Sequence, residues 1–333
     1  MILAKMTIHC CNFPKNKMHW TSIKERSAGF FRLRFMLLIY RIFGRSVLQI
    51  FIYPVVFFSV ISSKKLRAAS RQYLEQIYQK KGQNNFKKPN IFSIFKHVFT
   101  FADSLVDRVE SWSGNVNLDH LHIKTPEVFA KLIKHLEEKK GAVFISSHLG
   151  NIELFRAIGN LKNSEIIDRE LKINVIVQSN YTAKFNKIMT LINKNSATNL
   201  ISATEIDVEQ SIILNDKLQN GEILVISGDR TAQNNQDNNL SVNFLGKNAD
   251  FPNGPIALAN VMKVPTYFIF CLKAQGKGQF YELYFYEVDM KFETSRKEQK
   301  NNIPILIHEY VKTLENLCLQ YPYQWFNFFN FWR

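Results

Sequence analysis

The residues best suited by type and spacing to do chemistry are His148 and Glu153, which lie in the segment GAVFISSHLGNIELFRAI at 141–158. On one continuous helix this spacing turns through about 140°, so the two side chains would face apart. If His148 lies in a turn before the helix, at Gly150, the Glu153 carboxylate reaches back to the imidazole. That carboxylate would fix the tautomer and make His148 a general base for a hydroxyl nucleophile. The alternative is an ordinary histidine near a glutamate.

A second polar motif, Gly228-Asp229-Arg230, follows an apolar run that predicts a strand at 222–227. Arg230 is the best candidate for clamping a phosphate or stabilising an oxyanion, and Asp229 would hold the guanidinium in place. An ordinary turn with a surface ion pair is the alternative. The position of the motif after a strand of the same sheet as His148 favours a functional site.

Strand and helix patterns alternate around these motifs. Apolar runs predict strands at 142–145, 173–177, 222–227, 264–272 and 280–288, and amphipathic patterns predict helices at 64–81, 91–112, 126–140, 183–193, 208–218, 254–261 and 303–319. The segment 232–239 is too polar to pack and predicts a loop. This order predicts an α/β fold with a mostly parallel sheet flanked by helices, and an antiparallel pair near its end. Ligands of such sheets bind where strands end.

The N-terminal region differs from the rest of the chain. Residues 1–17 carry no periodic pattern and predict an unstructured extension, residues 18–63 predict membrane-associating helices, and residues 64–333 form the expected catalytic domain. Arg34, Arg41 and Arg45 share a narrow arc beside many large apolar residues. Such a basic amphipathic pattern is typical of an element lying on a membrane surface.

After a break at Gly44, residues 47–61 are nearly uncharged but fall short of the ~20 residues that a simple span needs, and Pro54 interrupts them. A membrane-dipping hairpin and a buried helical pair both fit. The cost of burying the arginines favours membrane contact.

The whole-chain charge limits the choice of partner. Lys and Arg total 43 against 28 Asp and Glu, a formal net charge of +15, which attracts phosphate on lipid or nucleic acid. No groove-reading motif is present and the basic residues cluster beside apolar ones, which argues against nucleic acid. The four cysteines form no C-x-x-C pair, which fits a reducing compartment. His120 and His122 lack a third ligand nearby, so we predict no metal site.

In combination and order, these motifs resemble the lysophospholipid acyltransferase superfamily. The resemblance is closest to the bacterial branch that includes lipid A biosynthesis acyltransferases, and within it to predicted acyltransferases often associated with aryl-polyene-type lipid pathways. It covers nearly the whole chain and rests on His19-Trp20, Tyr53-Pro54, Ser146 to Asn151 with Glu153, Gly228-Asp229-Arg230, Phe251 to Pro255 and Gln324 to Phe329.

The resemblance implies transfer of an acyl group from a thioester, on acyl carrier protein or coenzyme A, to a hydroxyl of a lipid acceptor. It implies a site on the cytoplasmic face of the inner membrane and no cofactor beyond the thioester. His148 would be the base and Glu153 its orienting acid, with backbone N–H groups near Gly150 and Asn151 as oxyanion donors. The alternative is a non-catalytic basic lipid-binding protein that retains the fold.

Other motif residues take roles from the resemblance alone. Phe251, Pro252 and Gly254 would line the acceptor or acyl side, with a turn and helix cap as the alternative. The aromatic segment 325–332 is open to an acyl channel wall, a bilayer interface or core packing. The segment 175–180 lacks the arginine common in lipid A acyltransferases, while a Glu at position 153 is usual in that branch and favours a glycolipid or other specialised acceptor.

Overall fold

A computed structural model describes residues 30–112, 121–154, 171–177, 198–231, 238–275 and 281–332. Several predicted features lie outside these residues: the extension at 1–17, the helix at 183–193, residues 178–180 of the segment that lacks an arginine, His120, and most of the polar loop at 232–239.

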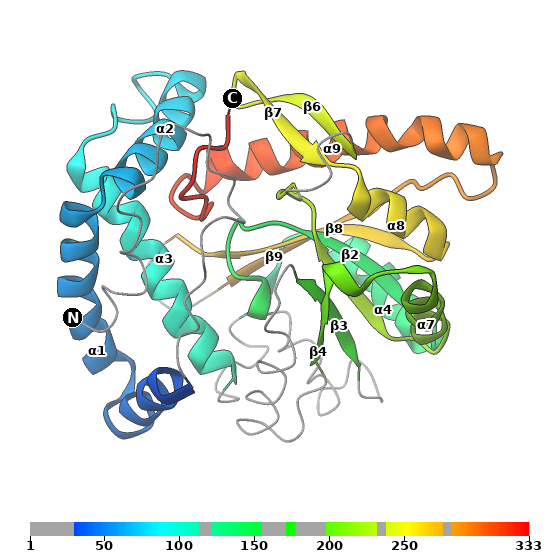
Figure 1. Ribbon diagram of the computed structural model, residues 1–333, viewed down its shortest axis with the longest axis horizontal. Helices are drawn as coiled ribbons and strands as arrows, with labels where there is room; N and C mark the ends of the chain where they lie inside the picture. Colours follow the sequence, from blue (N-terminus) through cyan, green and yellow to red (C-terminus); the bar gives the residue numbers. More distant parts are fainter. Residues whose placement is uncertain are drawn as a thin grey trace.

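The centre of the described fold is a seven-stranded sheet in the order β1-β9-β8-β2-β5-β3-β4 (Figure 1). Its strands are β1 (Leu121–Ile123), β2 (Ala142–Ser146), β3 (Ile173–Val177), β4 (Thr198–Ser202), β5 (Ile223–Ser227), β8 (Thr266–Lys273) and β9 (Tyr281–Val288). All neighbouring pairs are parallel except β8 and β9. The predicted α/β class, the mostly parallel sheet and the antiparallel pair near its end are confirmed, whereas the two edge strands, β1 and β4, were not among the predicted strands.

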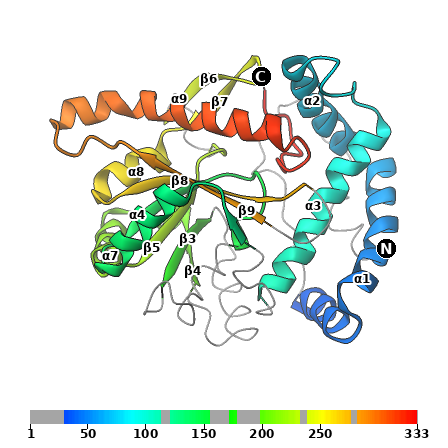
Figure 2. The same cartoon turned by 180° about the vertical axis from the view of Figure 1, so that it is seen from behind.

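Helices cover both faces of the sheet, and its central strands β2 and β5 are nearly continuous apolar runs, as strands buried on both faces require. Val143 and Ile145 of β2 point into one core, which also holds the inward side chains of α9 (Arg296–Gln320), α8 (Gly254–Met262) and α7 (Val208–Gln219). Ala142 and Phe144 point into the other, against α4 (Pro126–Glu137). The two views place α9 and α4 on opposite sides of the sheet (Figures 1 and 2).

Three N-terminal helices stand together at one end of the sheet: α1 (Phe30–Ser62), α2 (Lys64–Lys81) and α3 (Ile91–Trp112) (Figures 1 and 2). Gly44, with φ at +72°, kinks α1 where the sequence predicted a break. A sharp corner at residue 63 separates α1 from α2, and the Ser63 hydroxyl accepts from Leu66 N to begin α2. Arg67 donates to the carbonyls of Val60 and Ile61, which satisfies the end of α1.

The two faces of α1 have opposite environments. Its inner face, with Leu48, Ile52, Val56 and Val60, belongs to the same core as the sheet. Its outer face is apolar as well, and every large side chain on it is more than half exposed: Leu38, Ile42, Phe43, Ile50, Phe51, Tyr53, Phe57, Phe58 and Ile61. The buried-pair interpretation therefore accounts for one face only.

Of the three arginines that share one arc of this helix, Arg45 does not point outward. This side chain points inward and pairs with Asp103 at 2.7 Å and Asp107 at 2.5 Å, both on α3. The expectation that burial would be too costly was wrong for Arg45, because two carboxylates of α3 neutralise it. The side chains of Arg34 and Arg41 lie outside those described.

In the described fold, no single helix is long and apolar enough to cross a bilayer; residues 47–62 and 64–81 meet that test only as a pair bent by 93°.

The segment between β5 and α8 contains a hairpin of β6 (Asn239–Phe244) and β7 (Lys247–Pro252), where only a turn was predicted. Leu245 and Gly246 both have positive φ, as the tight turn of such a hairpin requires. The rings of Phe244 and Phe251 contact each other, with centroids 5.6 Å apart, and both pack against Phe331 near the C-terminus. Two short helical turns, η4 (Ile152–Leu154) and η6 (Ala203–Glu205), complete the described elements.

Candidate active site

His148 and Asp229 meet because they follow adjacent parallel strands. Ser146 of β2 is in register with Ser227 of β5, and each strand runs two residues further to one of these side chains. Gly228 N donates to Ser146 O at 2.8 Å, which carries the strand pairing to the edge of the site. A side chain at Gly228 would come within 2.9 Å of both Ile145 and Tyr310, so this approach requires glycine.

The imidazole and the carboxylate form a tight pair. His148 Nδ1 lies 2.8 Å from Asp229 Oδ1, and the backbone N–H of His148 donates to Oδ2 at 2.8 Å. Because a carboxylate only accepts, Nδ1 carries the proton and Nε2 keeps its lone pair. Within the described part of the chain Nε2 makes no hydrogen bond, and 33% of the His148 side chain remains exposed. The accessible edge of the ring is therefore the basic one.

The electrostatics keep the carboxylate charged and the imidazole neutral. Burial alone would raise the pKa of Asp229, but the interaction with His148 and then with Arg230 outweighs it and holds that pKa well below its usual range. The pKa of His148 is lowered from its ordinary value, first by burial and then by Arg230, while Asp229 opposes the shift. A neutral imidazole with an ionised partner is the resting state of a general base.

The acid that contacts the imidazole is therefore Asp229, whereas the sequence had pointed to Glu153. Glu153 lies in η4, five residues after His148, and makes no hydrogen bond to the imidazole in the described structure. The parallel pairing of β2 and β5 places the Asp229 carboxylate, and not that of Glu153, beside Nδ1 of His148. Asp229 was expected to hold the Arg230 guanidinium in place. In the structure, both of its carboxylate oxygens accept hydrogen bonds from His148.

The expected oxyanion donors at Gly150 and Asn151 were also wrong. Gly150 N donates to Gln324 O and Asn151 N to Cys271 O, each at 2.8 Å, so neither N–H is left for a ligand. Gly150 has φ at +77°, and a Cβ there would lie 2.0 Å from Cys271 O. The turn is thus pressed against β8, and this close contact explains the glycine.

The other predicted site residues divide between the site and the core. Arg230 follows Asp229 and its guanidinium carbon lies 5.7 Å from the centre of the Phe329 ring. Phe251 is fully buried, packed against Phe244, Tyr310 and Phe331, which makes it a core residue. Pro252 ends β7, and Gly254 begins α8 with open space where a side chain would stand.

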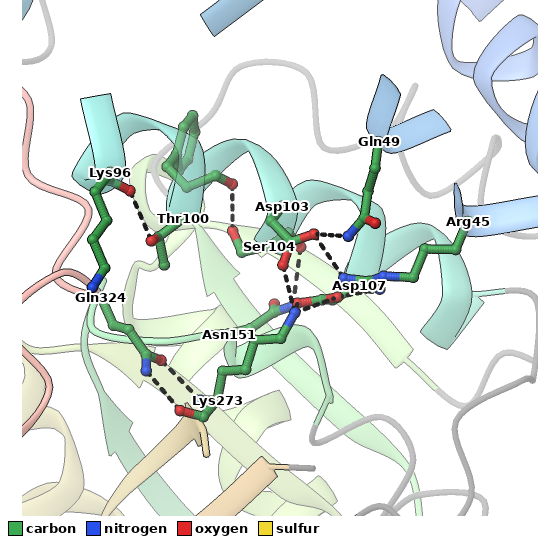
Figure 3. Close-up of polar contacts among 11 residues, drawn as sticks. Arg45, Gln49, Lys96, Thr100, Asp103, Ser104, Asp107, Asn151, Lys273 and Gln324 are labelled. Atoms are coloured by element: carbon green, nitrogen blue, oxygen red, sulfur yellow. Dashed lines mark hydrogen bonds and ion pairs between the residues drawn. The ribbon is translucent and has the colours of Figure 1, made fainter. Parts of the chain in front are cut away.

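Next to the Gly150–Asn151 turn lies a small hollow bordered by a network of charges. Lys273, at the end of β8, pairs with Asp103 at 2.5 Å and Asp107 at 3.3 Å, the same carboxylates that bind Arg45 (Figure 3). The Gln324 amide bonds the backbone N–H and carbonyl of Lys273, and Asn151 lies beside the Lys273 side chain (Figure 3). The network ties α1, α3 and β8 together behind the turn that carries His148. The hollow is lined by Thr100, Ser104, Asp107, Gly150, Asn151, Lys273, Tyr281, Gln324 and Phe326.

Metal and thiol chemistry have few candidates in the described residues. There, no group of three or more His, Cys, Asp or Glu side chains is placed to hold a metal ion. Cys271 and Cys318 are free thiols, both buried, and burial raises the pKa of each well above its ordinary value.

Two contributors to the site were not identified from the sequence. Ser227 Oγ donates to Asp229 Oδ1 at 2.8 Å, and Trp325 Nε1 donates to Oδ2 at 3.1 Å. Ser227 ends a predicted strand directly before Gly228, so its position was a usable signal. Trp325 is 96 residues from Asp229, and the sequence marked it only as part of the aromatic segment and of the motif from Gln324 to Phe329, without a role at the site.

Neither the known protein-family models nor the curated proteins include a match to this chain.

Proposed function

We propose that this protein is an acyltransferase that moves a fatty acyl group from a thioester to a hydroxyl of a lipid acceptor at a membrane surface. The observation that carries the proposal is the His148–Asp229 pair at 2.8 Å, with the basic edge of the imidazole accessible at the end of a parallel sheet. The motif order noted in the sequence supports the reaction class.

In this proposal His148 Nε2 takes the proton of the acceptor hydroxyl as its oxygen attacks the thioester carbonyl. The buried Asp229 carboxylate stabilises the imidazolium that forms. When the C–S bond breaks, the imidazolium returns its proton to the departing thiolate of acyl carrier protein or coenzyme A. Arg230 is the best placed residue to stabilise the oxyanion or a phosphate, since its charge already acts on both His148 and Asp229.

The outer face of α1 supports a membrane location at the cytoplasmic face of the inner membrane. Contiguous exposed apolar surface of this kind marks an interaction site. Lys64 and Lys65 are exposed directly after it, and cations beside an apolar face favour anionic lipid. The same surface would also suit the alternative function, lipid binding without catalysis, because lipid binding through the outer face of α1 does not require His148.

The test compares acyl transfer by purified variants, with acyl carrier protein and coenzyme A thioesters as separate donors and a total lipid extract as acceptor. We expect His148→Ala and Asp229→Asn each to lower turnover by about 10²–10⁴-fold. Glu153→Gln should lose much less, because Glu153 makes no hydrogen bond to the imidazole. His308→Ala, an exposed histidine on α9, is the matched control and should keep full activity.

Wild-type turnover in His148→Ala would contradict the proposed chemistry. Liposome binding by a protein that cleaves neither thioester would favour the alternative function. A Glu153→Gln defect as large as that of Asp229→Asn would instead restore Glu153 as the orienting acid. Lipid profiles of cells without the gene should show a species lighter by one acyl group, which would name both acceptor and chain.

A further inference from the structure

The side chain of Trp325 joins the C-terminal segment to the catalytic pair. Its indole N–H donates to Asp229 Oδ2 at 3.1 Å, the same oxygen that accepts from His148 N. Ser227 Oγ and His148 Nδ1 occupy the other oxygen. Each donor lowers the electron density that Asp229 offers to the imidazole.

The indole is locked where it stands. The ring is buried and packs against Tyr73, Phe244 and Phe331, with centroids 5.0, 5.2 and 4.8 Å away. Rotating the N–H away from Asp229 would require repacking this aromatic cluster, so the hydrogen bond is preorganised.

The backbone of Trp325 is fixed as well. Residue 325 pairs with Leu149 in an antiparallel bridge, and the next amide, Phe326 N, donates to His148 O at 3.0 Å. On the other side, His97 Nε2 lies 2.9 Å from Trp325 O, and Ser70 Oγ lies 2.9 Å from His97 Nδ1.

The buried His97 is a permanent donor in this arrangement. Because the Trp325 carbonyl only accepts, His97 Nε2 carries the proton and Nδ1 accepts from Ser70. Burial lowers the pKa of His97 to about 4, so the ring stays neutral at physiological pH and the contact does not titrate. Two helices, α2 and α3, thereby hold the segment that reaches Asp229.

We propose that Trp325 is a positioning residue that sets how strongly His148 binds a proton, by donating its indole N–H to Asp229. The role in turnover rests on the proposed function, but the effect on the His148 imidazole does not. The N–H withdraws charge from the carboxylate and keeps its plane aligned with the ring. His148 is thereby kept neutral and ready to accept a proton.

Other charged groups act on the same imidazole and must stay constant in the test. Arg230, adjacent to Asp229, and Arg108 on α3 both disfavour its protonated form, and Asp229 favours it. A substitution that removes only the indole N–H leaves these three charges in place.

The test is an NMR titration of the His148 ring in the full-length protein, with its resonance identified by its loss in His148→Gln. Trp325→Phe removes the N–H and keeps an aromatic ring. We expect the midpoint of the His148 titration to move upward by about half a pH unit or more, since the carboxylate becomes a stronger partner. The acid limb of kcat/KM should move upward with it.

Trp332→Phe is the matched control. Trp332 is buried in the same aromatic cluster, but its indole N–H donates to Phe244 O at 3.0 Å rather than to Asp229. This variant loses an equivalent hydrogen bond but keeps every donor to Asp229, so its His148 titration should match that of the wild type. Ser227→Ala, which removes another donor from Asp229, should shift the midpoint in the same direction as Trp325→Phe.

The proposal fails if Trp325→Phe and Trp332→Phe give the same His148 midpoint, or if Trp325→Phe moves it downward. Should Trp325→Phe not fold, an unshifted midpoint in Ser227→Ala would equally contradict the tuning of His148 through Asp229. An unshifted midpoint with normal acyl transfer overturns this inference and leaves the proposed function standing. A shifted midpoint in a protein that shows no acyl transfer supports this inference and contradicts the proposed function.

Discussion

At the residue scale, the candidate site consists of one accessible imidazole and one buried carboxylate held by four donors. The donors are the backbone N–H of His148, its ring Nδ1, the Ser227 hydroxyl and the Trp325 indole. A buried carboxylate without partners would be costly and would tend to protonate. Four hydrogen bonds keep the Asp229 carboxylate ionised. Its negative charge can then stabilise the imidazolium that forms when His148 accepts a proton.

The pH dependence of turnover should report His148. The pKa of His148 is lowered by burial and by Arg230, and the base works only when neutral. We therefore expect kcat/KM to rise through an acid limb whose midpoint lies below the ordinary histidine value of about 6.5. Steady-state kinetics from pH 4.5 to 8 on wild-type protein measure it, and a midpoint above the ordinary value would contradict the assignment.

The sequence identified His148 and Asp229 but paired the histidine with the wrong acid. Glu153 is close in sequence, and nothing in the sequence states that β2 and β5 are neighbours in parallel register. The sheet order, which depends on long-range packing, decides which carboxylate reaches Nδ1. For the same reason Trp325 was identified only as part of an aromatic segment.

At the element scale, three parts of the chain meet in a buried network of charges. Arg45 of α1, Asp103 and Asp107 of α3, and Lys273 of β8 neutralise one another (Figure 3). Burial would raise the pKa of Asp103, but Lys273 and Arg45 outweigh it and hold that pKa below its ordinary value. The network therefore stabilises the fold at neutral pH, and the contribution of Asp103 falls as acid protonates its carboxylate.

Lys273→Met should destabilise the protein strongly. It leaves Asp103 and Asp107 with one cation between them in a mostly buried setting, which costs about 3 kcal/mol. Lys131→Met is the control, because Lys131 pairs with Glu287 at 3.4 Å on the surface and such pairs contribute less than about 1 kcal/mol. Chemical unfolding curves measure both, and equal losses of unfolding free energy would contradict a structural role for the network.

Most helices and strands were predictable because apolar periodicity is a local signal. The strand at 173–177 and the helices at 64–81 and 91–112 have the predicted bounds. The β6–β7 hairpin was not predicted, because Asn, Asp and Lys interrupt its apolar alternation. The predicted environment of Arg45 was wrong because its partners, Asp103 and Asp107, lie 58 and 62 residues away in the sequence, and local patterns do not report such contacts.

At the scale of the whole molecule, the fold has one side that does not resemble a protein surface in water. The outer face of α1 carries a line of exposed Phe, Ile and Tyr side chains, while its inner face is part of the core. The ribbon shows this helix at one extremity, far from α7 (Figures 1 and 2). A planar apolar partner would fit this geometry.

Replacing Phe51 and Phe58 together by Ser should weaken binding to anionic liposomes by about tenfold or more, since two exposed aromatic side chains lose their burial in lipid. The matched control replaces Val208 and Ile212 by Ser, which are exposed on α7 and should leave binding unchanged. Sedimentation with vesicles measures both. Equal losses in the two double variants would contradict a dedicated membrane face on α1.

The bridge between Trp325 and Leu149 also means that the candidate site is completed only after residue 325 has been synthesised. His148 and Asp229 leave the ribosome well before that residue, so the nascent chain holds both without the indole that donates to Asp229. Any premature stop upstream of that codon would release a polypeptide with an intact sequence motif and an unfinished site.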